Sequence, residues 1–173
     1  MYIKIFGAFL IVISAYIFGL YYSKKDKYKS EDLEEIKKGL SIIKDEIMFL
    51  SLPLGEAFIT ASEKISGGAS KIFSDIGQGI KKNKDDTLAD VINNALDNNI
   101  SDTFMKKEDT ASLISLGKTM GDMDSDHQRS SIDMAISDIE DSINILTSSY
   151  QKNEKMYRSL FTLGGVLIAV ILM

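Results

Sequence analysis

The chain has 173 residues, with 20 lysines and arginines against 25 aspartates and glutamates, no cysteine and a single histidine, His127. These counts exclude disulfide frameworks, thiolate metal sites and cysteine nucleophiles, and they leave one residue for histidine-based catalysis. One proline and twelve glycines favour long regular elements. Apolar residues gather at both chain ends and charged residues in the middle, so we expect one domain flanked by two appendages.

The first appendage is an uncharged segment at the N-terminus. Ile5–Tyr22 contains 18 residues without a charge, and a helix of that length measures about 27 Å, close to the ~30 Å of bilayer hydrocarbon. Only Lys4 precedes the segment and no small-residue cleavage motif follows it, which disfavours a removed signal peptide. The sequence therefore predicts a transmembrane helix over residues 1–22.

The second appendage is the uncharged C-terminal segment Leu160–Met173. As a helix it measures only about 21 Å, but a snorkelling Arg158 and local thinning of the bilayer compensate for the shortfall. A buried core helix is the alternative, although a segment with no polar face is atypical of one. We predict a transmembrane helix over 159–173, in which Gly164 and Gly165 allow close packing against the first span, with self-association as the weaker alternative.

Basic residues flank both predicted spans on the side of the central region. They are Lys24, Lys25, Lys27 and Lys29 after the first span, and Lys152, Lys155 and Arg158 before the second. Such residues stay in the cytoplasm and are attracted by anionic lipid. We therefore expect a two-pass protein of the cell membrane, with residues 23–158 in the cytoplasm and both termini across the membrane.

The central region shows helical periodicity and no strand signal. The predicted helices cover residues 31–50, 54–65, 69–80, 87–96 and 107–120, followed by a long helix from 125 that continues into the second span. In the long helix, apolar residues recur at the spacing of a coiled-coil seam: Ile132, Ile136, Ile139, Ile143, Leu146 and Tyr150. The expected fold class is all-α, with two terminal transmembrane helices flanking a cytoplasmic bundle of about six helices.

Residues with strong end preferences set the predicted helix boundaries. Ser30 is the expected N-cap of the first helix, and Pro53 belongs to the first turn of the second. Gly67-Gly68 ends the second helix, Asp86 caps the fourth, and Asp97-Asn98-Asn99 forms the turn after it. Gly121 ends the fifth helix, and Ser125 with Gln128 forms a capping box at the start of the last.

Residues 23–158 carry 19 basic and 25 acidic residues, a net charge of −6. A nucleic-acid binder needs a basic face, so this balance argues against that class. No cofactor is expected.

Two short motifs resemble ligand sites but lack residues that such sites need. Ser112–Thr119 reads SLISLGKT, which lacks the first glycine of a phosphate-binding loop and lies in a helical context, so we interpret it as helix interior. Asp122, Asp124, Asp126 and Asp133 imitate a calcium-binding loop, but His127 occupies the position of its sharp turn and a bidentate glutamate is missing. The first three acids suit a helix N-terminus, and whether they also bind a metal ion stays open.

His127 is the remaining catalytic candidate. It stands beside Ser125 and Gln128 in a predicted first helical turn, where it would be exposed and nothing would desolvate a substrate. The sequence therefore predicts a protein that is not an enzyme.

Several short motifs, in their order and spacing, resemble the stage III sporulation protein AB family over nearly the whole chain. They are Leu52-Pro53-Leu54 with Glu56-Ala57, Leu116–Gly121 with Asp124 and Gln128, Asn153–Arg158, and Leu163-Gly164-Gly165. The departures are small, namely Thr162 before Leu163 and Met120 in place of leucine. The resemblance implies a role in endospore formation, in the mother-cell membrane that surrounds the forespore.

The family is similar to the cytoplasmic F domain of type II secretion systems, which implies a platform subunit of a secretion-like transenvelope complex. The implied partners are the secretion-type ATPase and other membrane subunits of that complex, with this protein as a homo-oligomer in the assembly. The alternative is a membrane-anchored sensor or regulator that signals through the long helix as a coiled coil. The several short helices favour the platform, because a coiled-coil sensor needs sustained heptads.

A predicted docking surface lies at the corner before the last helix. Lys118, Asp122, Asp124 and Asp126 share this corner, which two flanking helices hold in place. Its acids suit a basic patch on the ATPase, but ordinary helix capping is the favoured alternative, because exposed acids are common at helix starts.

Overall fold

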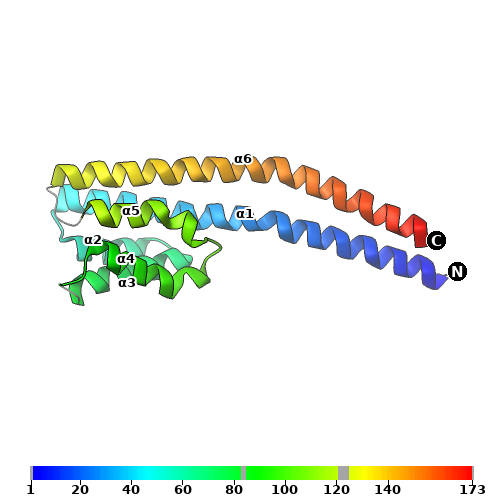
Figure 1. Ribbon diagram of the computed structural model, residues 1–173, viewed down its shortest axis with the longest axis horizontal. Helices are drawn as coiled ribbons and strands as arrows, with labels where there is room; N and C mark the ends of the chain where they lie inside the picture. The colour runs from blue at the N-terminus through cyan, green and yellow to red at the C-terminus, as the bar shows by residue number, and fades with distance from the viewer. Residues whose placement is uncertain (1, 83–84, 121–124, 173) are drawn as a thin grey trace. The chain divides into compact units, whose positions relative to one another are not determined.

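The computed structural model describes residues 2–82, 85–120 and 125–172, and the side chains of most residues in 2–24 and 150–172 lie outside that description. Figure 1 shows the helices α1 (Tyr2–Leu50), α2 (Leu54–Lys64), α3 (Gly67–Lys82), α4 (Leu88–Asn99), α5 (Ala111–Thr119) and α6 (Ser125–Leu172). Two short 3-10 helices, η1 (Ile100–Asp102) and η2 (Lys107–Thr110), connect α4 to α5. No strand occurs among the described residues, so the predicted all-α fold is confirmed.

The chain divides into two compact units. Lys29–Asn144 forms the helical body, and Met1–Tyr28 with Ile145–Met173 forms a terminal unit. Within the described residues, the structure contains no helix whose length and apolar character suffice for a membrane crossing. The predicted spans 1–22 and 159–173 fall on helical residues whose side chains are mostly outside the description, so their insertion stays a prediction.

The core of the body takes residues from all six helices. The spacing of Leu33, Ile36, Leu40, Ile43, Ile47 and Leu50 predicts one buried stripe on α1. The first four are buried, whereas Ile47 is only half-buried and Leu50, at the end of the helix, is exposed. Phe58 of α2 and Phe73 of α3 pack with ring centroids 5.4 Å apart. The other large, fully buried side chains belong to α3, α4, α5 and the residue after α5: Ile72, Ile76, Ile92, Leu96, Leu113 and Met120.

The seam of α6 packs within the same chain. Ile132, Ile139 and Ile143 are buried together with Ala135, whereas Ile136 and Leu146 are only half-buried. The side chain of Tyr150 is not among those that the structure describes. The predicted continuity of this helix is confirmed, since α6 runs from Ser125 to Leu172 without a break.

Close helix packing depends on glycine at several positions, of which Gly39 and Gly117 are examples. A Cβ at Gly39 of α1 would lie 2.5 Å from Cε1 of Phe73, and a Cβ at Gly117 of α5 would lie 2.9 Å from Cα of Ala89 in α4. Real Cβ atoms do not approach other atoms this closely, so a larger residue at either position would force the helices apart. These glycines set the spacing of α1 from α3 and of α4 from α5.

Several predicted helix boundaries are wrong. Ser30 does not cap a helix but is a buried residue inside α1, because α1 continues from the N-terminal segment without a break. Pro53 is the N-cap of α2 rather than part of its first turn. Gly67 begins α3 instead of ending α2, and its φ of +67° is one that glycine adopts readily.

The boundaries near α4 and α5 also differ. Thr87, not Asp86, caps α4, and its hydroxyl accepts the Asp90 N–H. The polar residues 97–99 remain helical, so the expected turn falls later. The predicted helix 107–120 is a 3-10 turn followed by α5. Gly121 lies outside the described residues, and the Ser125 side chain needed for the capping box is also undescribed.

Candidate functional site

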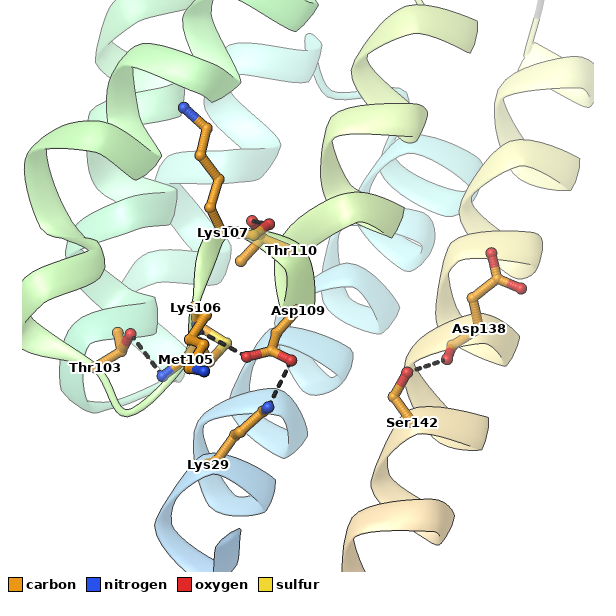
Figure 2. A network of polar contacts seen from close by, with 9 residues as sticks. All are labelled: Lys29, Thr103, Met105, Lys106, Lys107, Asp109, Thr110, Asp138 and Ser142. Atoms are coloured by element: carbon orange, nitrogen blue, oxygen red, sulfur yellow. Dashed lines mark hydrogen bonds and ion pairs between the residues drawn. The ribbon is translucent and has the colours of Figure 1, made fainter. Parts of the chain in front are cut away.

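An ion pair joins the start of the body in α1 to η2. Lys29 Nζ lies 2.6 Å from Asp109 Oδ1, and both side chains are only 18 % exposed (Figure 2). The other carboxylate oxygen, Asp109 Oδ2, accepts the Lys106 backbone N–H at 2.7 Å. A largely buried carboxylate with a charged partner and a backbone donor is held in one position, so Asp109 fixes both its own 3-10 turn and Lys29.

Asp32 makes a second attachment one turn further along α1. Its Oδ2 accepts the Phe104 backbone N–H at 2.6 Å. Desolvation by burial raises the pKa of Asp32, the Phe104 hydrogen bond lowers it, and the nearby Glu31 raises it, with a net upward shift. Lys29, Asp32 and Asp109, together with the loop residues 103–106, are named the α1 clamp below.

The loop of the α1 clamp is also braced internally. Thr103 Oγ1 donates to the Ile100 carbonyl at 2.7 Å and accepts the Met105 N–H at 3.2 Å, and Met105 is buried. Thr110 Oγ1 donates to the Lys107 carbonyl at 2.9 Å, while Lys107 Nζ pairs with Asp97 of α4 at 2.7 Å. The loop and η2 together therefore connect α1 to α4 through short, directional contacts.

Two ion pairs connect α1 to α6 within the body. Lys44 Nζ lies 2.9 Å from Asp133 Oδ1, and Lys37 Nζ lies 3.7 Å from Glu140 Oε1. Arg129 also approaches Asp133, at 3.8 Å. These pairs are partly exposed and contribute little stability each, but they neutralise the edge of α6 that faces α1.

An open groove of about 220 Å³ lies between α5 and α6. On α5 it is lined by Ser112, Ser115, Leu116 and Thr119, and on α6 by His127, Ser130, Ser131, Met134, Ala135 and Asp138. Most of these side chains are small, and they recur at helical spacing along the two helices. The groove is therefore a shallow channel between two helix faces, named the α5–α6 groove below.

The predicted docking corner is described only in part. Lys118 is exposed near the end of α5. Asp122 and Asp124 lie outside the described residues, and Asp126 is helical but its side chain is not described. The structure therefore does not bring these four residues together as a described site.

The predicted basic flanks differ in how the structure places them. Lys25 and Lys27 are exposed in α1, whereas Lys29 belongs to the α1 clamp. The side chains of Lys24, Lys152, Lys155 and Arg158 lie outside the description. Gly164 is exposed, and a Cβ built there meets no described atom within 4 Å; Gly165 has no described surroundings.

The motifs that resemble ligand sites are placed as follows. Ser112–Thr119 lies entirely within α5, which confirms the interpretation as helix interior. His127 is exposed and lines the α5–α6 groove. Among the described residues, which omit Asp122 and Asp124 of the calcium-like motif, no group of three or more acidic or histidine side chains is arranged to hold a metal ion.

The α1 clamp was not predicted from the sequence. In the sequence, Lys29 is expected only to flank the first span, and Asp32 belongs to no motif. Only the pairing of distant segments reveals their partners, and Asp109, near the start of a predicted helix, carried no distinguishing signal.

Comparison with known proteins agrees with this fold. Residues 4–173 match the sequence model of the family described as stage III sporulation protein AB. Stage III sporulation protein AB of Bacillus subtilis (strain 168) is 27% identical over 171 residues, which cover 99% of each chain. A solved structure of a stage III sporulation protein AB has a TM-score of 0.65 at 20% identity, covering 72% of this chain and 97% of that one. The similarity to this solved structure supports the all-α fold.

Proposed function

The chain belongs to the stage III sporulation protein AB family, and from this premise we propose that it is a non-enzymatic platform subunit of a membrane complex in endospore formation. In this role it couples a cytoplasmic ATPase to a channel between the mother cell and the forespore. Its partners are that ATPase, other membrane subunits, further copies of itself and membrane lipid. It resides in the mother-cell membrane as a two-pass protein with its body in the cytoplasm.

The observation that carries the proposal is the continuity of the two long helices. α1 extends from Tyr2 to Leu50 and α6 from Ser125 to Leu172, so each leaves the body and reaches a predicted membrane segment without a break. The α1 clamp attaches the smaller helices to α1 close to that exit. A helix transmits displacement only where it is unbroken and firmly attached, and both conditions favour a coupling element.

The alternative of a coiled-coil sensor receives less support from the structure. Its seam residues Ile132, Ile139 and Ile143 are buried against the body of the same chain. They are therefore occupied, whereas a signalling coiled coil uses its a and d positions to contact a second helix.

The proposal is tested with the full chain in lipid nanodiscs and the purified ATPase encoded for the same complex. We expect saturable binding that weakens as salt rises, because the body is acidic. A double variant at the predicted corner, Asp122→Asn with Asp126→Asn, is compared with Glu63→Gln and Asp85→Asn, which removes the same charge elsewhere. Absence of binding at low salt would refute the platform role. Equal effects of the two double variants would remove the corner from the interface.

A further inference from the structure

The α5–α6 groove is open, and an exposed face of α6 lies beside it. Met134 is 68% exposed, although Ile132, two residues before it, and Ala135, the residue after it, are both buried. Along the helix, Met134, Asp138 and Asp141 follow one another at spacings of four and three residues, so they share a face. That face presents one large apolar side chain followed by two carboxylates.

The charges on α6 are divided between its two edges. Asp133 and Glu140 pair with Lys44 and Lys37 of α1. Asp138 and Asp141 are exposed and form no ion pair with another described residue; the contact of Ser142 goes to the Asp138 backbone oxygen at 3.0 Å, and Figure 2 shows the carboxylate projecting from the helix. The edge toward α1 is therefore neutralised, while the edge beside the α5–α6 groove stays negative.

The dimensions of the groove indicate the kind of ligand. Its volume of about 220 Å³ is below the roughly 300–1,000 Å³ of pockets that enclose small molecules. Small side chains on both walls, such as Ser115, Ser131 and Ala135, leave it open along the helices. A channel of this form accommodates a helix, whose apolar side chains enter between α5 and α6 at intervals of three or four residues.

We propose that the α5–α6 groove binds a basic amphipathic helix of a partner protein, with its apolar face against the exposed Met134 and its cations on Asp138 and Asp141. Charge complementarity determines this choice of occupant. A second copy of the chain is disfavoured, because its net charge of −5 would repel this face. The inference rests on the proposed function only in assuming that the body receives a partner, and it does not require that partner to be the ATPase.

The test uses the full chain in nanodiscs of neutral lipid and a synthetic helical peptide of leucine and lysine. A second peptide, in which glutamate replaces every lysine, is the charge control. Because the chain has no cysteine, Ser131→Cys introduces a single site for a fluorescent label in the groove. Ser101→Cys, exposed in η1, provides a matched label away from it. We expect the lysine peptide to change the Ser131→Cys signal saturably and leave the Ser101→Cys signal unchanged, with no response to the glutamate peptide.

Unlabelled variants measured by calorimetry separate specific docking from general attraction to an acidic protein. Asp138→Lys should weaken binding of the lysine peptide by about tenfold or more, whereas Glu63→Lys, the same charge change on the exposed surface of α2, should alter it less than about twofold. Met134→Ala should weaken it as well. Equal loss in Asp138→Lys and Glu63→Lys, or equal response of both labels, would overturn the inference. If the peptide fails while the ATPase binds, the groove is refuted and the platform role stands.

Discussion

Lys29 and Asp109 lie far apart in the sequence, yet Nζ of the first and Oδ1 of the second are 2.6 Å apart in the body. One turn further along α1, Asp32 accepts the Phe104 N–H at the same distance. Two carboxylates thus make the connection, one from each side. Asp32 of α1 accepts a hydrogen bond from the loop, and Asp109 of η2 forms an ion pair with Lys29 of α1. The attachment of the small helices to α1 depends on this reciprocal arrangement.

Asp109→Ala should destabilise the body by about 1–3 kcal/mol, because it leaves the half-buried Lys29 without its partner and the Lys106 N–H without an acceptor. Urea unfolding of the full chain in detergent, followed by circular dichroism, measures the change. Glu108→Ala removes an exposed carboxylate from the neighbouring position of η2 and should have little effect. Equal destabilisation by the two variants would show that the ion pair contributes nothing specific.

The raised pKa of Asp32 predicts a pH dependence of opposite sign to that of a salt-bridged acid. Its pKa lies above the ordinary value of 3.8 in the folded state, mainly because burial disfavours the charged form. The folded state therefore binds the proton more tightly than the unfolded state, and this contribution to stability is complete below about pH 3.8 and is lost as the pH rises through the folded pKa.

Asp32→Asn removes this titration while keeping an oxygen that can accept the Phe104 N–H. The free energy of unfolding of the wild type minus that of Asp32→Asn should therefore fall as the pH is raised from 3 to 7, by less than about 1 kcal/mol because the group is partly solvated. Urea midpoints of both proteins at several pH values give this difference. A difference that rises with pH would show that the Phe104 hydrogen bond outweighs desolvation.

Gly39→Ala should destabilise the body by about 1–3 kcal/mol, because the added methyl group would overlap the fully buried ring of Phe73. In the Phe73→Leu background, Gly39→Ala should lower the free energy of unfolding by less, because the smaller side chain leaves room for the methyl group. The two substitutions should therefore be non-additive in a double-mutant cycle. Gly7→Ala, where a Cβ meets no described atom within 4 Å, is the control and should not destabilise. Additive effects of Gly39→Ala and Phe73→Leu would contradict direct contact.

The proposed two-pass topology predicts the sides on which reporters will lie. Fusions at residues 1 and 173 should be outside the cytoplasm, and an insertion at residue 100 should be inside, because basic residues flank both predicted spans on the side of the body. Alkaline phosphatase and a cytoplasmic fluorescent protein report the two sides. One terminal fusion on the cytoplasmic side, with a stable full-length product, would contradict the hairpin arrangement.

The fold was largely predictable because its helices are amphipathic. Leu33, Ile36, Leu40 and Ile43 are buried at the spacing of an amphipathic helix, and the boundaries of α2 agree within one residue. Local rules failed where tertiary packing competes with capping preference. Ser30 has an excellent N-cap sequence, but helix α1 already passes through it, so its hydroxyl cannot cap a new helix. A helix boundary lies at Gly67 as expected, but this glycine starts α3 instead of ending α2.

The candidate sites were much less predictable. The pattern of acids around Asp122 suggested a docking corner, while the α1 clamp and the α5–α6 groove depend on which helices become neighbours. Asp138 and Glu140 look alike in the sequence. Only the fold shows that Glu140 meets Lys37 and that Asp138 borders a groove. Charge patterning therefore predicts an acidic helix but cannot distinguish its neutralised edge from its free one.

Ile139→Asp tests whether the α6 seam is internal to the body. Ile139 is 2% exposed, so the substitution would bury an unpaired carboxylate and leave a cavity, at a cost on the order of 3–5 kcal/mol. Ser137→Asp adds the same charge two residues earlier, on an exposed position of the same helix, and should change stability by less than about 0.5 kcal/mol. Chemical denaturation of both variants, with the oligomeric state recorded by light scattering, separates the possibilities. If Ile139→Asp retained full stability but lost self-association, the seam would face another chain, and the coiled-coil alternative would replace the platform.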